Sequence, residues 1–384
     1  MSSMEAYLCA AARRLFRLAP IDRKKVVFCS YYGKGYSDSP KAIAEALLAS
    51  GEDLKLVWLL RDPKDAAHLP EGISPASYRG IRRVWELSTA AAWVDNCRKG
   101  ERCKRKGQYY LQTWHGFALK RIEQDAADAL EPLYVRSCIQ DSAQCDLMVS
   151  GSGFMTRLYQ RAFWYQGSVA EYGTPRNDVF FSPQPQLSEK VRRAFGLPED
   201  RKLVLYAPTF RADHSCSAYQ LDVPALLEAC RDRFGGQWSG LIRLHPNVAE
   251  RSAGLFAYDG GAILDATAYP DMQELLCAAD ILVTDYSSCM FDFALSGKPC
   301  FQFATDIEAY RLDRNFYFPL DTLPFPLAGS NQALCRAVRS FDAQQYAGNW
   351  DAFAQEHHFC EDGHAARRCA DWILARLHGK EGTV

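Results

Sequence analysis

Short apolar segments alternate with helix-like segments along the chain, and this alternation limits the fold more than any other feature of the sequence. In the first half, the apolar segments lie at residues 25–33, 54–60, 90–96 and 145–152. The alternation resumes in the second half, with apolar segments at residues 202–210, 239–247, 261–267, 279–288 and 298–306. Strands that alternate with helices build parallel sheets covered by helices. The sequence therefore predicts an α/β fold.

Two domains are expected, because 384 residues exceed one ordinary core and suit two domains of roughly 150–200 residues each. The alternation pauses at residues 180–190, FFSPQPQLSEK, where two prolines and several polar residues predict a linker. We therefore expect one Rossmann-like domain at residues 1–182 and a second at residues 190–384. A further hypothesis is that the last helix, near residues 365–377, packs back on the first domain.

The overall composition argues against several classes of protein. A hydrophobic content of 48% with 24% charged residues is typical of a globular chain. The formal net charge of −1 argues against a general nucleic-acid binder, so local charge has to provide any recognition of anions. No apolar run reaches the roughly 18 residues that a membrane-spanning helix needs.

The cysteines indicate a reducing compartment. The 14 cysteines are scattered along a long chain without a secretory signal, which is typical of reduced thiols in the cytoplasm. No CxxC pair occurs, although His357, His358, Cys360 and His364 are residue types that bind metals. A polar turn before the last helix is the favoured interpretation of that segment, so neither a metal nor a cofactor is expected.

The N-terminal segment has an amphipathic pattern. Its apolar side chains recur at helical spacing, while its arginines lie largely elsewhere; the apolar positions are Met4, Leu8, Ala11, Leu15 and Leu18. A helix at residues 1–19 with this pattern suits the surface of an anionic bilayer. It equally suits a helix that packs on the protein with its arginines in water. The sequence leaves both interpretations open.

Polar residues follow several of the predicted strands, at the edge where open parallel sheets bind their ligands. One of them is His115, which follows the apolar segment YYLQTW (109–114). The others are Arg211, His245, Asp285, Ser287 and Ser288. A single histidine is more often structural than catalytic, but the recurrence of polar residues at several strand ends favours a site. The two serines open a predicted helix, where they can cap the helix or, with its free N–H groups, bind an anion. These two interpretations are compatible.

Several motifs, in their order along the chain, resemble one known family. The motifs are TWHGFALK (113–120), GTPRND (173–178), YAPTFR (206–211), RLHPN (243–247), DMQELLCAADILVTDYSSCMFDFA (271–294) and YRLDRNFYF (310–318). Together they resemble the CDP-glycerol glycerophosphotransferases, which make teichoic acids and related phosphate-linked capsular polymers. The resemblance runs from residue 26 to residue 368, so it covers nearly the whole chain.

The resemblance implies a GT-B-like arrangement, in which two Rossmann-like domains with parallel sheets face a central cleft. It also implies transfer of glycerol phosphate from CDP-glycerol to a hydroxyl of a lipid-linked glycan or polyol phosphate acceptor, with release of CMP. Such an enzyme would work in the cytoplasm as a peripheral protein on the anionic inner face of the cell membrane. The alternatives are a CDP-ribitol-type polyol phosphate transferase, a GT-B sugar transferase and a non-catalytic binding protein.

The chemistry of this transfer suggests what the family's residues would do. The acceptor hydroxyl has to lose a proton, and the resemblance makes His115 of the TWHG motif its general base, oriented by Glu123 or Asp125. CMP leaves as a phosphate monoester whose second pKa is about 6, so it scarcely needs a proton at neutral pH. Stabilisation of negative charge on the diphosphate is therefore expected to matter more than acid catalysis.

The groups that bind the donor are expected in the second domain. His245 is assigned to the diphosphate oxygens as the second catalytic residue. The other candidates for donor binding are Arg211, Asp271, Glu274, Asp285, Ser287 and Ser288. Among them, Glu274 is expected to contact a hydroxyl of the ribose.

A cluster of six basic residues at 98–106 precedes the motif that contains His115. It is expected either to attract a phosphate-bearing acceptor, or the membrane that carries it, or to be a solvated loop. The sequence does not distinguish the two interpretations.

Overall fold

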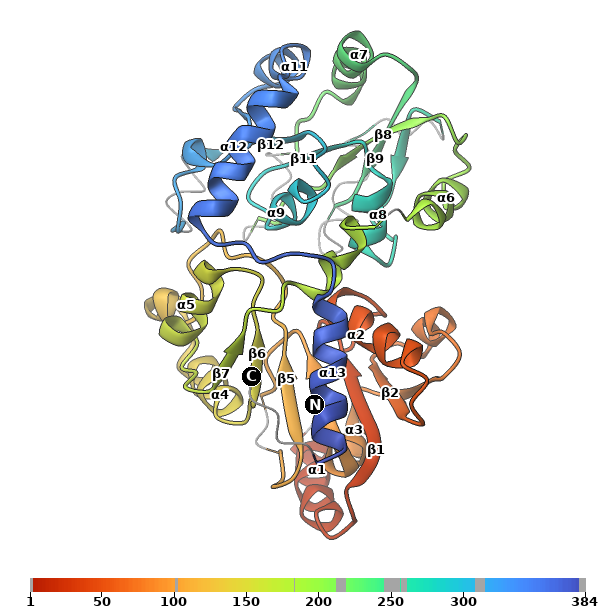
Figure 1. Cartoon of the computed structure of the whole chain (residues 1–384), viewed down its shortest axis with the longest axis vertical. Helices are drawn as coiled ribbons and strands as arrows, with labels where there is room; N and C mark the ends of the chain where they lie inside the picture. Colours follow the sequence, from red (N-terminus) through yellow and green to blue (C-terminus); the bar gives the residue numbers. More distant parts are fainter. Residues whose placement is uncertain are drawn as a thin grey trace. The chain divides into compact units, whose positions relative to one another are not determined.

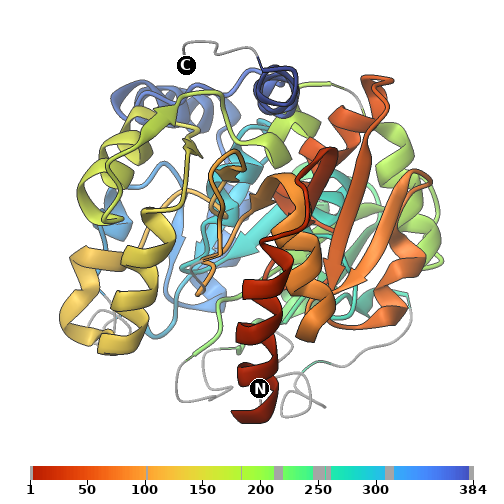
Figure 2. The same ribbon diagram turned by 90° about the horizontal axis from the view of Figure 1, so that it is seen from below.

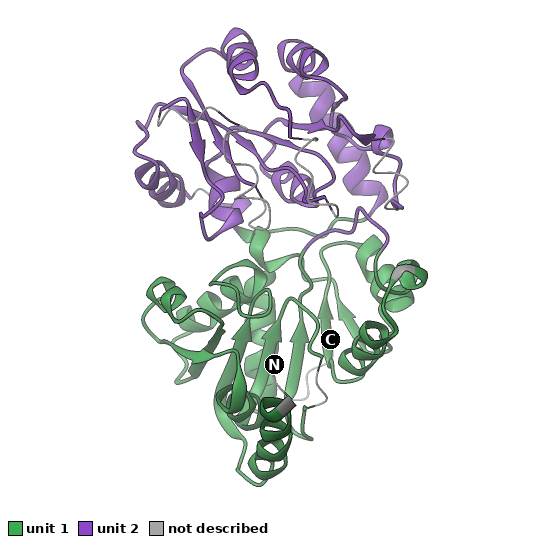
Figure 3. Cartoon of the chain, turned by 180° about the vertical axis from the view of Figure 1, so that it is seen from behind, with its two compact units in different colours: residues 1–115, 122–178, 358–384 green, residues 116–121, 179–357 purple. Residues whose placement is uncertain are grey.

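The computed structural model describes residues 3–100, 103–182, 184–211, 219–244, 256, 261–307 and 315–379. Contacts divide the chain into two compact units (Figure 3). Unit 1 comprises Met1–His115, Ile122–Asp178 and His358–Val384, and unit 2 comprises Gly116–Arg121 and Val179–His357. The division differs from two continuous domains at 1–182 and 190–384, because the segment after His115 belongs to unit 2 and the C-terminal segment belongs to unit 1.

Unit 1 is built on a parallel sheet of seven strands in the order β3-β2-β1-β4-β5-β6-β7 (Figure 1). The strands are β1 (Asp22–Cys29), β2 (Lys55–Leu60), β3 (Ile73–Ser77), β4 (Ala90–Asp95), β5 (Tyr109–Gln112), β6 (Leu147–Val149) and β7 (Ser168–Ala170). Every neighbouring pair is parallel. All of β4 and most of β1 are buried, which explains their continuous apolar runs, since helices cover both faces of such a sheet.

The helices of unit 1 cover the two faces of this sheet. They are α1 (Ser3–Phe16), α2 (Asp38–Ala49), α3 (Gly80–Thr89), α4 (Pro132–Ser142), α5 (Gly153–Ala162) and α13 (Ala365–Leu377), with short 3₁₀ helices at Pro63–His68, Glu123–Ala129 and Pro175–Phe180. Alternate residues of β1 face opposite cores, as strand geometry requires. Val26 belongs to the core that contains Ile43 of α2, whereas Val27 belongs to the core that contains Leu87 of α3.

The C-terminal helix α13 packs on unit 1, which confirms the hypothesis for the last helix. Its Trp372 and Ile373 belong to the same core as α2. The carboxylate of Asp178 accepts hydrogen bonds from the backbone N–H groups of Ala365 and Ala366 at 3.0 and 2.8 Å. A carboxylate in this place satisfies free donors of the helix and complements its positive end, so it fixes where α13 begins.

Unit 2 is built on a parallel sheet of six strands in the order β10-β9-β8-β11-β12-β13. The strands are β8 (Lys202–Tyr206), β9 (Trp238–Ile242), β10 (Ile263–Asp265), β11 (Ile281–Thr284), β12 (Cys300–Phe303) and β13 (Leu327–Ala328). Its helices include α6 (Pro185–Ala194), α7 (Val223–Phe234), α8 (Met272–Ala278), α9 (Cys289–Ala294), α11 (Asn331–Arg339), α12 (Ala343–Glu356) and a 3₁₀ helix at Leu320–Thr322.

Helix α6 begins inside the segment that was expected to be a linker. Pro185 occupies its first turn, where the missing N–H of proline breaks no helical hydrogen bond. Val191 is buried, and α6 packs on α8 of unit 2. Pro185 therefore begins a packed helix rather than a linker.

Both sheets follow the strand order of a Rossmann fold. In unit 1 the order reverses between β1 and β4, and in unit 2 it reverses between β8 and β11. Ligands of such folds bind beyond the carboxyl ends of the strands at this switch point. The predicted α/β class with two Rossmann-like parts is confirmed, and the two switch points are where functional side chains are expected.

Helix α1 lies beside α3 (Figures 1 and 2). Cys9 and Ala12 pack against Val84, and the rings of Phe16 and Trp85 meet edge to face at 5.0 Å. Within the described residues, none of the helices combines the length and the apolar character needed to cross a bilayer.

Candidate active site

His115 lies in the loop after β5, beside the switch point of unit 1. Its Nδ1 is 2.7 Å from the backbone oxygen of Asn96, which follows β4. A carbonyl oxygen only accepts hydrogen bonds, so Nδ1 carries the proton and Nε2 of the neutral ring has a free lone pair. Burial lowers the pKa of His115 below its usual value, and the hydrogen bond to Asn96 offsets only part of this effect. The ring is therefore neutral at pH 7 and can accept a proton at Nε2.

The group that orients His115 is thus a backbone carbonyl, where a carboxylate was expected. Glu123 instead accepts a hydrogen bond from Arg98 at 2.8 Å, and Asp125 forms an ion pair with Arg161. The ring of Trp114 stacks on the imidazole with centroids 4.2 Å apart, which restrains the imidazole further. Sequence distance alone gave no means of choosing this partner.

Asn96 contributes a second polar group at the same switch point. Its Oδ1 accepts a hydrogen bond from the backbone N–H of Tyr31 at 2.8 Å, and this contact fixes which end of the amide is nitrogen. Its Nδ2 is buried and has no hydrogen-bond partner within the described residues. Buried donors of this kind are nearly always satisfied by protein, water or ligand, so this amide marks a place for a bound oxygen atom.

Asp38, Tyr31 and Arg176 form a buried polar cluster near His115. The carboxylate of Asp38 accepts hydrogen bonds from the guanidinium of Arg176 at 2.6 Å and from the hydroxyl of Tyr31 at 2.5 Å. Burial alone would raise the pKa of Asp38, but Arg176 and the hydrogen bond from Tyr31 outweigh it and lower the pKa. The ring of Tyr31 is 5.9 Å from that of His115. Sequence reasoning missed this cluster, although both GTPRND and the segment after the first strand carried the signal.

Backbone strain gathers in the same loops. Tyr31, Tyr32, Asp38 and Trp114 have φ angles of 44°, 59°, 66° and 55°, in the left-handed region. This region costs a non-glycine residue about 1–2 kcal/mol. Such residues persist only where surrounding contacts hold them, and they cluster at functional sites. The strain therefore supports a site around His115.

In unit 2, Arg211 connects the loops that follow β8, β11 and β12. Its guanidinium pairs with Asp285 at 2.9 Å and with Asp306 at 2.7 and 3.0 Å. Burial alone would lower the pKa of Arg211, but the two carboxylates raise it. Asp285 also accepts a hydrogen bond from the backbone N–H of Thr209 at 2.7 Å. The guanidinium N–H groups of Arg211 thus bind two carboxylates from different loops, and these contacts hold the switch-point loops of unit 2 together.

Asp271 and Glu274 both lie at the start of α8. Asp271 is the N-cap of this helix, and its carboxylate accepts a hydrogen bond from the N–H of Gln273 at 2.9 Å. Glu274 is buried and accepts hydrogen bonds from Lys190 at 2.8 Å and from the hydroxyl of Tyr269 at 2.7 Å. The structure gives both carboxylates partners within unit 2.

Ser287 and Ser288 are half-buried at the start of α9, close in sequence to Asp285. The hydroxyl of Ser287 is 3.4 Å from the N–H of Cys289, whereas Ser288 makes no capping hydrogen bond with its side chain. Asp285, Ser287 and Ser288 thus share the loop after β11. His245, which follows β9 in the sequence, lies outside the described residues.

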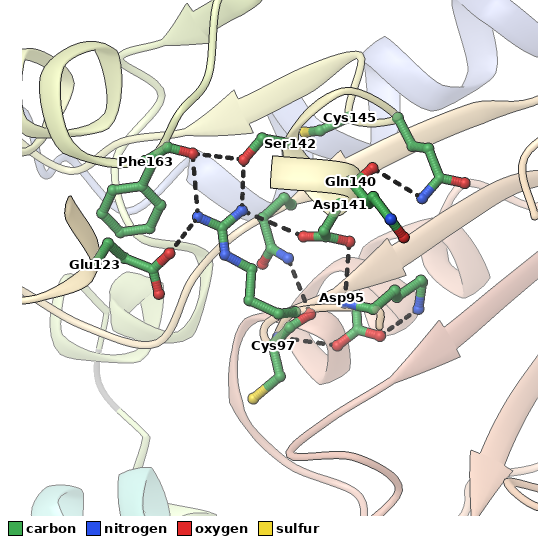
Figure 4. Close-up of polar contacts among 12 residues, drawn as sticks. Asp95, Cys97, Glu123, Gln140, Asp141, Ser142, Cys145 and Phe163 are labelled. Carbon is green, nitrogen blue, oxygen red and sulfur yellow. Dashed lines mark hydrogen bonds and ion pairs between the residues drawn. The ribbon is translucent and has the colours of Figure 1, made fainter. Parts of the chain in front are cut away.

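The basic segment at 98–106 is neither a solvated loop nor an open cationic surface in its described part. Arg98 and Lys99 are buried, and their side chains pair with Glu123, Asp141 and Asp95 (Figure 4). Lys104 pairs with Asp146, and Arg105 donates hydrogen bonds to the backbone oxygens of Ala19 and Ser88. The carboxylates neutralise Arg98, Lys99 and Lys104, so these charges stabilise unit 1.

His358 and Cys360 make hydrogen bonds with the backbone of unit 1. The carbonyl oxygen of His358 accepts a hydrogen bond from Gly153 at 2.9 Å, and the thiol of Cys360 is 3.6 Å from the carbonyl oxygen of Ser150. Across the described part of the chain, no group of three or more His, Cys, Asp or Glu side chains is arranged to hold a metal ion.

Comparisons with known proteins place this architecture in a family. The sequence model of the CDP-glycerol:poly(glycerophosphate) glycerophosphotransferase family matches residues 11–375 of this chain. The teichoic acid poly(glycerol phosphate) polymerase of Bacillus subtilis is 30% identical over 94% of this chain and 50% of its own length. The teichoic acid glycerol-phosphate transferase of Staphylococcus aureus is 29% identical over 92% of this chain and 93% of its own.

The solved structure of the wall teichoic acid polymerase TagF is similar to this chain with a TM-score of 0.83 and 28% identity, over 98% of this chain and 96% of that one. The chain spans about half the length of the polymerases of Bacillus subtilis and Staphylococcus epidermidis that it matches. The family match extends from α1 through both sheets to α13. The chain therefore belongs to the CDP-glycerol:poly(glycerophosphate) glycerophosphotransferase family.

Proposed function

We propose that this protein transfers glycerol phosphate from CDP-glycerol to a hydroxyl of a lipid-linked acceptor and releases CMP, in the synthesis of a teichoic acid or a capsular polymer. Family membership supports this reaction, as does a TagF variant solved after a soak with CDPG. The observation that carries the proposal is the His115 ring, whose Nδ1 is held by the Asn96 carbonyl. This contact leaves Nε2 free to take a proton from an alcohol.

The acceptor hydroxyl attacks the β-phosphorus of CDP-glycerol while Nε2 of His115 removes its proton. A new P–O bond forms to the acceptor, and the bond between the β-phosphorus and the oxygen of CMP breaks. CMP leaves with its electron pair as a phosphate monoester, whose second pKa of about 6 makes it a good leaving group. The Asn96 carbonyl stabilises the imidazolium that forms, and the buried amide Nδ2 of Asn96 is a donor for an oxygen of the substrate.

The switch-point loops of unit 2 are proposed to bind the donor. Ser287 and Ser288 supply hydroxyl groups for the diphosphate, together with His245. Arg211 and Asp285 would act mainly by holding these loops in place, since their charges are paired with each other. Glu274, with Asp271 at the same helix start, stays our candidate for a ribose hydroxyl, which would share its carboxylate with Tyr269.

A donor assay tests this function. The full chain is incubated with CDP-glycerol, CDP-ribitol or common nucleotide sugars and a short acceptor, and the release of CMP, UMP or UDP is measured. We expect CMP release from CDP-glycerol. Replacement of His115 with Ala should lower kcat by about 10²–10⁴-fold, because a base acts in the transition state, while calorimetry shows unchanged CDP-glycerol binding. His68→Ala is the matched control, since His68 is an exposed histidine of the same unit.

Other outcomes of this assay would favour other functions. Preference for CDP-ribitol is the second candidate, because a teichoic acid ribitol-phosphate primase of Bacillus spizizenii is 28% identical over 96% of this chain. Release of UDP or UMP from a nucleotide sugar would identify a sugar transferase. Donor binding without any turnover would identify a binding protein and refute the assignment of His115.

We also propose that α1 contacts an anionic bilayer, as a peripheral enzyme at the inner face of the cell membrane would require. One side of α1 packs on α3, and apolar residues outside that side are exposed to solvent. These are Met4 (66% exposed), Tyr7 (72%), Leu8 (47%) and Leu15 (63%). Exposed arginines at 14 and 17 add attraction for anionic lipid. Under this proposal the helix would both pack on the protein and contact the membrane, the two interpretations that its sequence pattern left open.

Vesicle sedimentation tests the membrane contact. Replacement of Leu8 and Leu15 with Glu should abolish sedimentation with phosphatidylglycerol vesicles at physiological salt, because it places charge on the apolar face. Ala10→Glu is the control, since Ala10 is exposed on the same helix but outside this face. Activity on a soluble acceptor should be unchanged. Equal sedimentation of the double variant and the wild type would show that the contact lies elsewhere.

A further inference from the structure

A cavity of about 380 Å³ opens in unit 1 between α1 and the start of α3, apart from the His115 cluster. Its walls include Glu5 of α1, Arg61 after β2, and Tyr78, Arg79 and Arg83 at the start of α3. Three arginines against one glutamate give the lining a net formal charge of +2. The volume suits a small charged group with the atoms attached to it, and the charge selects an anion.

Two of the cavity's three arginines are restrained before any ligand binds. The guanidinium carbons of Arg61 and Arg83 lie 5.0 and 4.6 Å from the centre of the Tyr78 ring. The ring is held in turn, because the backbone of Gly33 approaches it so closely that a Cβ there would be 2.8 Å from Tyr78 Cβ. Restrained guanidinium groups lose little freedom when they bind, and their geometry matches phosphate oxygens.

The start of α3 is unusual in its charge. Its N-cap is Arg79, whose side chain makes no capping hydrogen bond, and its first turn contains no acidic residue. Arg82 and Arg83 follow in the same turn, although the positive end of a helix normally attracts acidic side chains. Arg82 is balanced by Glu86 at 2.7 Å and does not line the cavity. An anion bound in the cavity would complement the arginines and the helix end together.

We propose that this cavity binds a phosphate group of the lipid-linked acceptor. This inference rests on the proposed transfer to a phosphate-bearing acceptor. Unit 1 holds the proposed base for the acceptor hydroxyl, and the cavity lies at the same carboxyl edge of its sheet, where Gly33 accepts a hydrogen bond from the N–H of Arg61 at 2.8 Å. The other wall is α1, whose exposed apolar side is the proposed membrane contact. A phosphate close to the lipid end of the acceptor would therefore meet these arginines.

Acceptor kinetics test the proposal. The acceptors are a short alkyl glycerophosphoglycerol and the matching alkyl glycerol, which lacks phosphate. In the variant with Arg61→Ala and Arg79→Ala, we expect KM for the phosphate-bearing acceptor to rise roughly tenfold or more, with KM for the alkyl glycerol and for CDP-glycerol unchanged. Arg82→Ala is the matched control and should change none of these values. An equal rise for both acceptors, or no rise, overturns the proposal.

Three further measurements make the result decisive. If the double variant does not fold, Arg79→Gln, at an exposed position, should still raise the same KM by roughly threefold. If the double variant also binds phosphatidylglycerol vesicles more weakly, by a factor that matches its rise in KM, the phosphate comes from the bilayer and the acceptor assignment is overturned. If the wild type releases no CMP with either acceptor, the proposed function fails. Calorimetry with the alkyl glycerophosphoglycerol then still tests the cavity, because binding that the double variant retains in full overturns the inference.

Discussion

Removal of Arg98 is expected to destabilise unit 1 strongly. The side chain of Arg98 is 3% exposed, and it pairs with Glu123 at 2.8 Å and Asp141 at 3.3 Å, whose side chains are 2% and 0% exposed. It also donates a hydrogen bond to Ser142 at 2.8 Å. Arg98→Met keeps much of the apolar volume but leaves two buried carboxylates without their cation. Breaking a buried ion pair from one side costs about 3–5 kcal/mol of the free energy of unfolding.

Hydrogen exchange measured by mass spectrometry follows individual peptides, so it can report the loss of stability in unit 1 separately. The measurement therefore does not require the whole chain to unfold in one step. A loss of about 3 kcal/mol raises the exchange-competent population roughly 100-fold, which should appear in peptides that cover β4, β5 and α4. Arg161→Met is the control, because Arg161 is 62% exposed and its pair with Asp125 is worth about 0–1 kcal/mol. Equal and small effects of the two variants would refute the reasoning.

The effect of Arg98→Met should depend on pH. Burial raises the pKa of Asp141, and Arg98 counteracts that rise. Without Arg98 the folded-state pKa of Asp141 rises further above its unfolded value of 3.8, so folding then favours the protonated carboxyl. Stability lost by the variant is therefore largest at pH above the folded pKa, and it is regained as the pH falls through that pKa toward 3.8. A loss that stays constant from neutral pH down to pH 4 would contradict the burial of an unpaired charge.

Two other predictions concern His115 and the loop after β1. As the pH is lowered, kcat/KM for transfer should fall with a midpoint below pH 6.5, because burial lowers the pKa of His115 and only the neutral ring is a base. A midpoint above pH 6.5 would exclude this histidine as the base. Gly33→Ala should lower the unfolding temperature more than Gly35→Ala, by an amount equivalent to about 1–3 kcal/mol. Both glycines have positive φ, but only at Gly33 would a Cβ meet Tyr78, at 2.8 Å. Equal shifts in thermal denaturation would show that the Tyr78 ring moves away freely.

The sequence predicted the class of the fold because most strands are buried on both faces. Strands such as β4 and β8 appear as continuous apolar runs that no other element explains. The strands that it missed are short or partly exposed: β13 has two residues, and the ISPAS segment of β3 buries only Ile73 and Ala76. Such strands depend on their neighbours in the sheet rather than on a local pattern. The return of α13 to unit 1 was a hypothesis from the sequence, and it likewise rests on tertiary contacts, here with α2.

From the sequence, the candidate site could be predicted only for residues whose position after a strand was itself the signal. His115 follows an apolar strand and was found from that position. The pair of Asp38 and Arg176 joins residues 138 positions apart, so its recognition requires the strand order. The basic segment was misinterpreted for the same reason, because the acidic partners of Arg98 lie 25 and 43 residues away. A run of like charges predicts a solvated surface only when no acidic partner is folded against it.

The two sheets show the same relation between topology and chemistry. At the switch point of unit 1, Nδ2 of Asn96 has no hydrogen-bond partner within the described residues, and the same holds for Oγ1 of Thr209 at the switch point of unit 2. A buried polar atom without a partner costs about 1–3 kcal/mol. In unit 1 this cost adds to that of four strained residues, and in unit 2 it accompanies a fixed pair of Arg211 and Asp285. Ligands bound at the two switch points would complete these hydrogen bonds and offset the cost.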